Sequence, residues 1–320
     1  MKYKFLIFSA LSLGFLSTQV AAVVPNTNAH VGTYNLILKG DLDTSNDIEG
    51  RMLVGGNINM AGRSLDVGSK LPSSADIDAV TVVGNMTATD VKAENGNNII
   101  YGGNIGSTTL LTNGGGTATQ VNQSTLQSQF NSIWNSVEAD SAYFASLATN
   151  ASITGDSNNP RFGSSVATDL TVYSLSTNDL NNQNATYKFN SSPTVPVVIN
   201  VDVTGKSNVV INAKSSIEQN EYGMVLWNFY NTDSTEFTLS FNGDGWRGSI
   251  LAPYANITSS TNALEGGVAA LSYTGSVQLH NYLYTYAPPP EPPTEDVPAP
   301  AGMLLIGLGL IVMARRKFTK

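Results

Sequence analysis

Apolar positions in the central part of the chain come in short runs that end in glycine and asparagine. Three segments share one form: an apolar strand, a Gly–Asn corner and a second short strand. They are Arg51–Met60, Val80–Ala88 and Asn98–Gly106. Glycine permits positive φ and asparagine tolerates the left-handed region, so both favour tight corners. The recurrence of this corner at Asn57, Asn85 and Asn104 predicts a mainly β protein, a β-solenoid in which each coil covers its neighbour.

The second half of the chain carries further runs of apolar and β-branched residues, which predict strands. They are Thr194–Val203, Asn208–Asn212, Gly223–Phe229, Thr235–Phe241, Trp246–Pro253 and Leu264–Ala270. The stretch Asn242–Gly245 also suits a hairpin turn, so an antiparallel β-sandwich is the alternative fold. We favour the solenoid because many turns are Gly and Asn corners within apolar strands.

One segment, about residues 121–148, contains neither glycine nor proline. Its apolar side chains recur at mostly helical spacing, which predicts one long α-helix beside the solenoid. Asn122 or Ser124 can cap its start, and an interruption near Asp140 is an alternative. Phe130 and Trp134 are expected to pack in the core.

The N-terminal end has the pattern of a secretory signal peptide. Two lysines in Met1–Lys4 precede an apolar run of about a dozen residues, which is shorter than the ~20 residues of a membrane span. Small residues follow, with Val20 and Ala22 at the −3 and −1 positions of a cleavage site. We therefore expect a signal peptide over residues 1–22, followed by one β-rich domain over residues 23–286.

The C-terminal end has three parts. Residues 287–296 are rich in proline and favour an extended, semi-rigid stalk. Within residues 297–320, positions 301–314 are apolar or glycine and form a short predicted transmembrane segment. Arg315, Arg316 and Lys317 follow it, which is the arrangement of a stop-transfer signal with cytoplasmic cations. An ordinary C-terminal anchor is the alternative interpretation.

This tail resembles the PEP-CTERM sorting signal of Gram-negative bacteria. The resemblance rests on Val297, Pro298, Ala299 and Pro300, on the apolar stretch Met303–Leu310, and on the basic cluster Arg315–Lys317. The family usually has glutamate in place of Ala299. The resemblance implies secretion across the inner membrane, membrane contact through the tail, and processing near Pro298–Pro300 by an exosortase-type sorting protease. It also implies a final location at the cell surface or in the extracellular matrix, often with polysaccharide and biofilm.

The domain itself resembles the choice-of-anchor A domain over roughly residues 29–286. The matching segments are Tyr34–Leu42, Asp47–Asn57, Val225–Phe229, Gly248–Ala255 and Leu264–Ala270. That family is similar to bacterial adhesive domains and occurs with different C-terminal anchors, which agrees with the sorting tail. The resemblance implies no catalytic activity.

Composition and charge narrow the classes of function. Charged residues make up 12% of the chain, about half the ~25% of an average protein. The absence of cysteine excludes disulfides, thiolate zinc sites and a cysteine nucleophile. Residues 23–300 carry 10 basic and 24 acidic side chains, a net charge of −14 against −8 for the whole chain. We therefore expect no nucleic-acid partner, and the charge leaves room for cation-bridged contact with acidic polysaccharide.

Asp41, Asp43 and Asp47 are the candidate metal ligands. Oxygen ligands at alternating positions suit Ca²⁺. However, Asn46 replaces the glycine of a calcium loop, and Met52 stands where a bidentate glutamate belongs. A solvated acidic loop is the favoured interpretation, calcium the alternative, and no other cofactor is expected.

Glu49 and Glu265 occupy similar places in the two halves, each followed by a glycine. Buried carboxylates need partners, so we expect both to hold adjacent coils through backbone N–H groups. The residues assigned structural roles are Glu49, Arg51, Gly55, Gly56, Asn57, Glu265, Gly266 and Gly267. A catalytic carboxylate pair would require both acids in one groove, and the Gly-x-Ser-x-Gly motif of hydrolases is absent.

The sequence thus predicts a secreted, surface-sorted, non-enzymatic protein for adhesion or matrix attachment, binding extracellular polysaccharide or another cell surface. Two alternatives are open: a polysaccharide hydrolase or lyase on a solenoid, and an ice- or crystal-binding protein. Aligned threonines such as Thr87 and Thr89 on a flat face would favour ice, whereas a curved or charged face would count against it. Four tyrosines near the end, Tyr273, Tyr282, Tyr284 and Tyr286, are candidates for stacking on sugars.

Overall fold

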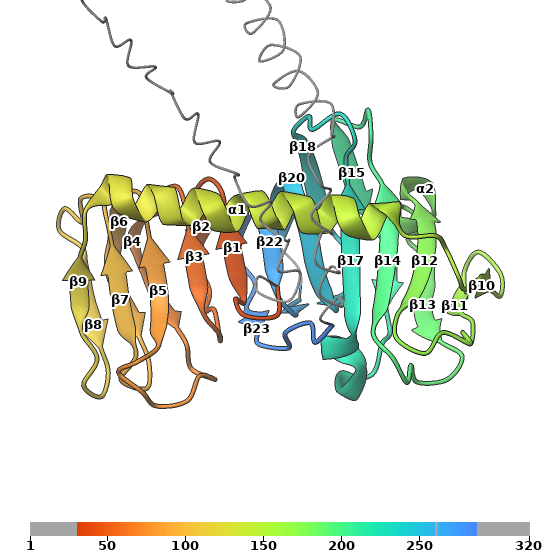
Figure 1. Ribbon diagram of the computed structural model, residues 1–320, viewed down its shortest axis with the longest axis horizontal. Helices are drawn as coiled ribbons and strands as arrows, with labels where there is room; N and C mark the ends of the chain where they lie inside the picture. Colours follow the sequence, from red (N-terminus) through yellow and green to blue (C-terminus); the bar gives the residue numbers. More distant parts are fainter. Residues whose placement is uncertain (1–30, 260–261, 287–320) are drawn as a thin grey trace, which may run out of the picture. The chain divides into compact units, whose positions relative to one another are not determined.

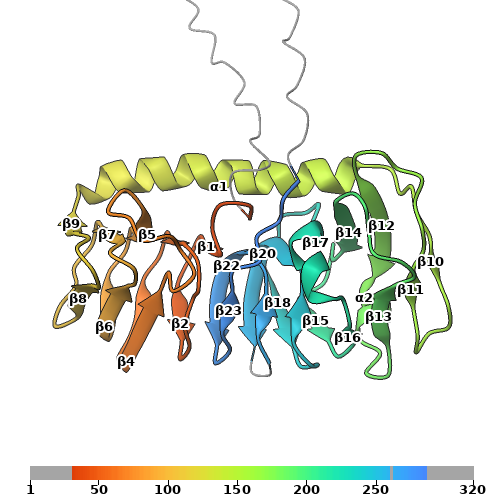
Figure 2. The ribbon, with the colours of Figure 1, turned by 90° about the horizontal axis from the view of Figure 1, so that it is seen from below.

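The computed structural model describes residues 31–259 and 262–286. In this region the chain winds into a solenoid of β-strands, with one long helix lying along it (Figures 1 and 2). Among the described strands, every ladder is parallel except the one between β10 and β11. The predicted β-solenoid with a single long flanking helix is confirmed. The antiparallel sandwich is wrong, because Asn242–Gly245, the stretch that suggested a hairpin, leads from β18 (Phe237–Phe241) to β19 (Trp246–Arg247), which do not pair with each other and lie on different faces of one coil.

The first described strand lies in the middle of the solenoid and not at an end. From β1 the coils progress outward to β9, and the face that they build beneath the helix is here called face A (Figure 1). The strands of this outgoing half on face A are β1 (Leu36–Leu38), β3 (Met52–Val54), β5 (Asp78–Val82), β7 (Asn98–Tyr101) and β9 (Ala118–Gln120).

Helix α1 (Gln123–Ser146) then runs back along face A to the opposite end of the solenoid (Figure 1). The returning half coils inward from there, until β22 pairs with β1 and closes the seam between the halves. Its face A strands are β12 (Thr171–Ser176), β14 (Val197–Asp202), β17 (Val225–Tyr230), β20 (Ser249–Ser259) and β22 (Val268–Gly275).

Two further faces complete each coil. Face B consists of β15 (Asn208–Ile211), β18 (Phe237–Phe241), the C-terminal parts of β20 and β22, β2 (Leu42–Thr44), β4 (Ile58–Val67), β6 (Met86–Ala93) and β8 (Thr109–Thr112). Face C consists of β10 (Ile153–Thr154), β11 (Arg161–Phe162), β13 (Thr186–Phe189), β16 (Lys214–Ser215), β19 (Trp246–Arg247), β21 (Leu264–Glu265) and β23 (Leu279–His280). Two short helices, α2 (Thr177–Leu180) and the 3-10 helix η1 (Gln219–Met224), join strands of the returning half.

The corner between faces A and B of the outgoing half is a ladder of asparagines. The side chain of Asn57 accepts the backbone N–H of Asn85 at 2.8 Å, and Asn85 accepts that of Asn104 at 2.8 Å. The glycine before each asparagine is required by close approach, because a Cβ on Gly84 would collide with the carbonyl of the glycine one coil below. The recurring Gly–Asn pair therefore sets the spacing of these coils.

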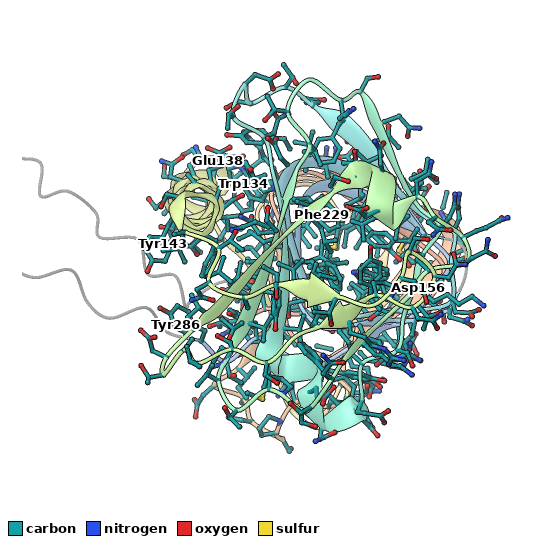
Figure 3. All side chains as sticks on the ribbon, turned by 90° about the vertical axis from the view of Figure 1, so that its right-hand side faces the viewer. Trp134, Glu138, Tyr143, Asp156, Phe229 and Tyr286 are labelled. Atoms are coloured by element: carbon teal, nitrogen blue, oxygen red, sulfur yellow. The ribbon has the colours of Figure 1, made fainter. Side chains whose placement is uncertain are left out.

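The interior of the solenoid is apolar and, in the returning half, aromatic. Phe229 points into the centre of the coil, as the view along the solenoid shows (Figure 3). Trp227 and Trp246 are fully buried, with ring centroids 4.5 Å apart. Burial of such large apolar side chains supplies most of the favourable free energy of folding.

Helix α1 is continuous through Asp140, so the alternative with an interruption there is wrong. Asn122 is the N-cap and accepts the backbone N–H of Thr125 at 3.1 Å. Phe130 and Trp134 are each 2% exposed and pack in a second apolar cluster between α1 and face A, as predicted. Because the helix covers the apolar outer side of face A, both surfaces of its central strands are buried, whereas the terminal strand β9 is exposed.

Several predictions concern residues that lie outside the described part of the chain. They are the signal peptide (1–22), the stalk (287–296), and the sorting tail (297–320) with its transmembrane segment (301–314). Among the described helices, none has the length and apolar character needed to cross a bilayer.

Candidate functional site

Face B carries outward-facing polar side chains in rows that cross the coils. One row follows the ladder register from Ser240 to Thr258, Thr274 and Asp43, and then to Asn59 and Thr87. A parallel row joins Asn208, Thr238, Asn256 and Ser272. Neighbouring strands lie about 4.8 Å apart, so the rows repeat polar groups at that interval.

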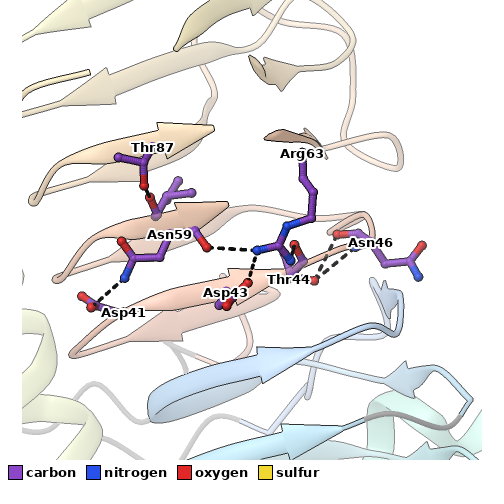
Figure 4. Close-up of polar contacts among 8 residues, drawn as sticks. Asp41, Asp43, Thr44, Asn46, Asn59, Arg63 and Thr87 are labelled. Atoms are coloured by element: carbon purple, nitrogen blue, oxygen red, sulfur yellow. Dashed lines mark hydrogen bonds and ion pairs between the residues drawn. The ribbon is translucent and has the colours of Figure 1, made fainter. Parts of the chain in front are cut away.

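Hydrogen bonds between coils fix these side chains in place. Thr258 donates its hydroxyl to Ser240 at 2.8 Å, and Ser272 donates to Asn256 at 2.5 Å. Asn59 donates to the carboxylate of Asp41 at 2.9 Å (Figure 4). The surface is thus pre-ordered, because each of these side chains is held by the neighbouring coil.

The centre of face B is charged. Arg63 forms an ion pair with Asp43 and donates hydrogen bonds to the backbone carbonyls of Thr44 at 2.8 Å and Asn59 at 3.1 Å (Figure 4). A bulge between Met60 and Ser64 lifts Arg63 out of the strand register. Beside it lies a shallow hollow of about 380 Å³, lined in part by Thr258 and Thr274 of the returning half. The rows are therefore uncharged over β18, β20 and β22 and charged where the two halves meet.

The pattern that marks these rows is present in the sequence but was missed there. The three strands read Thr238-Leu239-Ser240, Asn256-Ile257-Thr258 and Ser272-Tyr273-Thr274, each with two polar residues around one buried apolar residue. An alternating segment of this kind exposes its polar residues on one face of a strand. Alignment of the three segments with one another would have indicated the rows.

The three predicted calcium ligands are engaged separately. Asp41 accepts the backbone N–H of Asn57 at 2.7 Å, and Asp43 pairs with Arg63. Burial, followed by the nearby carboxylate of Asp66, raises the pKa of Asp47. Within residues 31–259 and 262–286, no three acidic or histidine side chains are grouped as a metal site requires. Calcium binding by these residues stays a prediction.

Glu49 and Glu265 both lie on face C near the seam. Glu49 accepts the backbone N–H of Asn281 at 3.2 Å, which is the kind of contact expected of it. The carboxylate of Glu265 instead contacts Nδ1 of His280 at 2.7 Å. Arg51 places its guanidinium 4.7 Å from the ring centre of Tyr34 and donates to the carbonyl of Asp78.

The glycines given structural roles lie at tight contacts between coils. Gly55 donates its N–H to the carbonyl of Leu38 at 2.8 Å, and a Cβ on it would collide with the ring of Phe130. Gly56 precedes Asn57 in the corner ladder described above, and its N–H donates to the carbonyl of Gly40. At the seam, Gly267 donates to the hydroxyl of Ser249 at 3.0 Å, and the carbonyl of Gly266 accepts a side-chain hydrogen bond from Asn35.

The structure corrects the role proposed for three of the four late tyrosines, whereas Tyr282 is partly exposed and packs edge-on against Tyr222. Tyr273 and Tyr284 are each 1% exposed and Tyr286 is 7% exposed, so they cannot stack on a sugar. Tyr284 and Tyr286 pack edge-on or tilted against Phe144 of α1. Residues 281–286 are not a strand, and the alternation of tyrosines there reflects packing beneath the helix.

Known proteins share features with this chain. The family model described as "Putative Ice-binding-like adhesive domain" matches residues 27–281. Among solved structures, the chain is similar to the ice-binding protein from an Antarctic ascomycete, Antarctomyces psychrotrophicus. The two share 10% identity over 81% of this chain and 97% of that chain, with a TM-score of 0.30. No curated protein matches the chain. Because the family model covers most of its length, the chain belongs to the family of ice-binding-like adhesive domains.

Proposed function

We propose that this domain attaches an exported protein to a hydrated extracellular surface through face B. The observation that carries the proposal is the row from Ser240 to Thr87, whose members repeat with the coils. Several of these side chains are held by the neighbouring coil: Thr258 donates to Ser240, Asn59 to Asp41, and Thr87 to the carbonyl of Ile58. Side chains that are already ordered lose little conformational entropy on binding. A regular array of hydroxyl, amide and carboxylate groups suits a partner that repeats its own hydroxyls, such as a polysaccharide.

Ice is the second candidate, supported by the uncharged part of face B. Within the two rows, β18, β20 and β22 contribute threonine, serine and asparagine alone. The ion pair of Arg63 and Asp43 interrupts this block at the seam, and a charged surface favours a polar polymer over the uncharged lattice of ice. Attachment to extracellular polysaccharide or a second cell is therefore the first proposal.

The location proposed for the domain comes from the two ends of the chain. A signal peptide cleaved after Ala22 would export it across the inner membrane of a Gram-negative bacterium. The PEP-CTERM-like tail would then be processed by an exosortase near Pro298–Pro300, with the choice-of-anchor A domain left at the cell surface. Mass spectrometry of the mature protein tests this step, since a C-terminus near Pro300 supports sorting and retention of Lys320 indicates a plain membrane anchor.

A non-enzymatic role completes the proposal. The family is adhesive, and on face C Glu265 is engaged with His280 while Glu49 holds a backbone amide. If the domain were a polysaccharide hydrolase or lyase, Glu265→Gln would abolish the release of sugar fragments. We expect no release from the wild-type protein on any glycan that it binds.

Bulky substitutions on face B test the attachment itself. Thr258→Tyr and Thr274→Tyr place a ring across the polar rows, whereas Asn135→Tyr places the same ring on the exposed side of α1. We expect the two face B variants to lose binding on glycan arrays and to isolated matrix, and Asn135→Tyr to keep it. Ice-recrystallisation assays on the same three variants address the second candidate. Equal binding by all three variants would contradict any role of face B.

A further inference from the structure

Face C of the returning half presents one cation on each of four consecutive coils. They are Arg161 on β11, Lys188 on β13, Lys214 on β16 and Arg247 on β19. We call these four residues the basic strip. Residues 23–300 contain 10 basic side chains in all, so a large share of them lies on this one face of an otherwise acidic protein.

Two of these cations stand directly opposite each other, and neither forms an ion pair with an acidic side chain of the described residues. Arg161 and Lys188 are register partners in the ladder of β11 and β13. Like charges at such positions destabilise a sheet. Neither side chain forms a hydrogen bond or ion pair within the described part of the chain. The nearby carboxylate of Asp156 accepts the backbone N–H groups of Asn158 and Asn159 on Oδ1 at 2.8 and 3.0 Å. These bonds, and more weakly the charge of Arg161, lower the pKa of Asp156, but no ion pair forms between these two side chains.

The other two cations border a groove of about 370 Å³. Lys214 lies 3.1 Å from Asp244, and both side chains are about half exposed. Arg247 donates from Nε to the hydroxyl of Tyr222 at 3.0 Å. Its terminal nitrogens have no partner among the described residues, and they remain available for a bidentate contact with a carboxylate. Thr186, Ser216 and Glu265 supply hydroxyl and carboxylate groups along the same groove.

We propose that the basic strip binds a carboxylated polysaccharide, with the polymer lying across coils β11, β13, β16 and β19. At about 4.8 Å per coil the four cations span roughly 14 Å, which is long enough to meet several sugar units. The arginines and lysines take the carboxylates, whereas Asp244 and Glu265 accept hydrogen bonds from sugar hydroxyls. Double-stranded DNA carries one negative charge per about 1.7 Å of its axis, a higher charge density than that of a carboxylated polysaccharide, so the same two acids repel it more strongly and nucleic acid is disfavoured.

This site is separate from face B and has a different ligand chemistry. Face B presents rows of hydroxyl and amide groups with the paired Arg63 and Asp43 at its centre, whereas the basic strip lies on β11, β13, β16 and β19, none of which belongs to face B. Asp156 precedes Arg161 of the basic strip by five residues. In the view along the solenoid, Asp156 lies on the opposite side from Trp134 and Glu138 of α1 (Figure 3). Binding at the basic strip is therefore independent of how face B functions.

Binding to immobilised polygalacturonate tests the proposal with two charge-matched double variants of the full chain. The first variant, Arg161→Gln with Lys188→Gln, removes the two cations that face each other across β11 and β13. The second variant, Lys70→Gln with Lys206→Gln, removes two exposed cations elsewhere. We expect affinity to fall roughly tenfold in the first variant and to change less than about twofold in the second. Binding of the wild type should also weaken with added salt, because exposed charges are screened.

Three outcomes would overturn the proposal: no binding of polygalacturonate by the wild type, equal loss in both double variants, or tighter binding of double-stranded DNA than of polygalacturonate. Neutral dextran serves as the uncharged polymer, and its binding should be the same in both double variants. Asn135→Tyr on the exposed side of α1 should bind polygalacturonate like the wild type. When Thr258→Tyr is added to either double variant, the difference in affinity between the two should stay the same, so a failure of this proposal is distinguishable from a failure of attachment through face B.

Discussion

The side chain of Asn35 donates a hydrogen bond to the backbone carbonyl of Gly266 at 2.9 Å, although the two residues belong to opposite halves of the solenoid. The same amide donates to the carbonyl of His280 at 3.0 Å and accepts the N–H of Gly50 at 3.0 Å. Asn35 is fully buried. One amide side chain therefore joins three coils at the seam, directly beside the ladder of β1 and β22.

Asn35→Ala should destabilise the fold strongly. The substitution leaves the carbonyl of Gly266 and the N–H of Gly50 buried without partners, and each such group costs about 1–3 kcal/mol. The carbonyl of His280 keeps the backbone N–H of Tyr282 at 3.0 Å. We expect a loss of about 3–5 kcal/mol in the free energy of unfolding, measured by denaturant titration. Asn208→Ala, which removes an exposed asparagine of face B, is the matched control and should change stability by less than about 0.5 kcal/mol. Similar losses in both variants would show that the seam does not depend on Asn35.

Gly84→Ala should destabilise the corner ladder. A methyl group there would lie against the carbonyl of Gly56 on the coil below, and the expected loss is about 2–3 kcal/mol. Gly62 has φ of +77° and open space where a methyl group would lie, so Gly62→Ala should cost only the backbone strain of about 1 kcal/mol. Thermal unfolding of the two variants separates crowding from strain. The prediction fails if Gly62→Ala is the more damaging change.

Asp140 should make the stability of the fold depend on pH. Its side chain is 2% exposed, Oδ1 has no hydrogen-bond partner among the described residues, and burial raises the pKa of the carboxyl from 3.8 to about 8. Below about pH 4 the group is protonated in both folded and unfolded chains. Between about pH 4 and pH 8 only the unfolded chain ionises, so the free energy of unfolding falls as pH rises through this range.

Asp140→Asn should remove that part of the pH dependence. Relative to the wild type, the variant gains stability progressively up to about pH 8, and melting temperatures measured across this range test the trend. Glu236→Gln, at an exposed position, should leave the slope unchanged. Parallel curves for wild type and Asp140→Asn would contradict the assignment.

Asn228 should hold the C-terminal half of α1 on the sheet. It donates to the carbonyl of Ser141 at 2.9 Å and accepts the hydroxyl of Ser141 at 2.7 Å. It also donates to Asn200, which in turn donates to the carbonyl of Phe144. In Asn228→Ala we expect faster amide hydrogen exchange in the last two turns of α1 and unchanged exchange near Leu126. Uniform acceleration along the whole helix would indicate global destabilisation instead.

Local chemistry made much of the fold predictable. The Gly–Asn corners indicated the coils because only glycine fits where the backbones of successive coils touch. The absence of glycine and proline from residues 121–148 indicated helix α1. The late tyrosines were misjudged because alternation along a segment does not reveal what covers it. In this protein α1, formed far earlier in the sequence, lies over Tyr284 and Tyr286.

The sequence alone determined the β-solenoid class, the repeat of its outgoing coils and the flanking helix, because these depend on residues that are close along the chain. Only the tertiary structure decided that the chain starts in the middle, that β22 closes on β1, and that face B and the basic strip exist as surfaces. The physical reason is that a parallel ladder pairs strands of different coils, and these strands can be far apart in the sequence, as β1 and β22 are. The residues within one strand do not specify which other coil it will pair with.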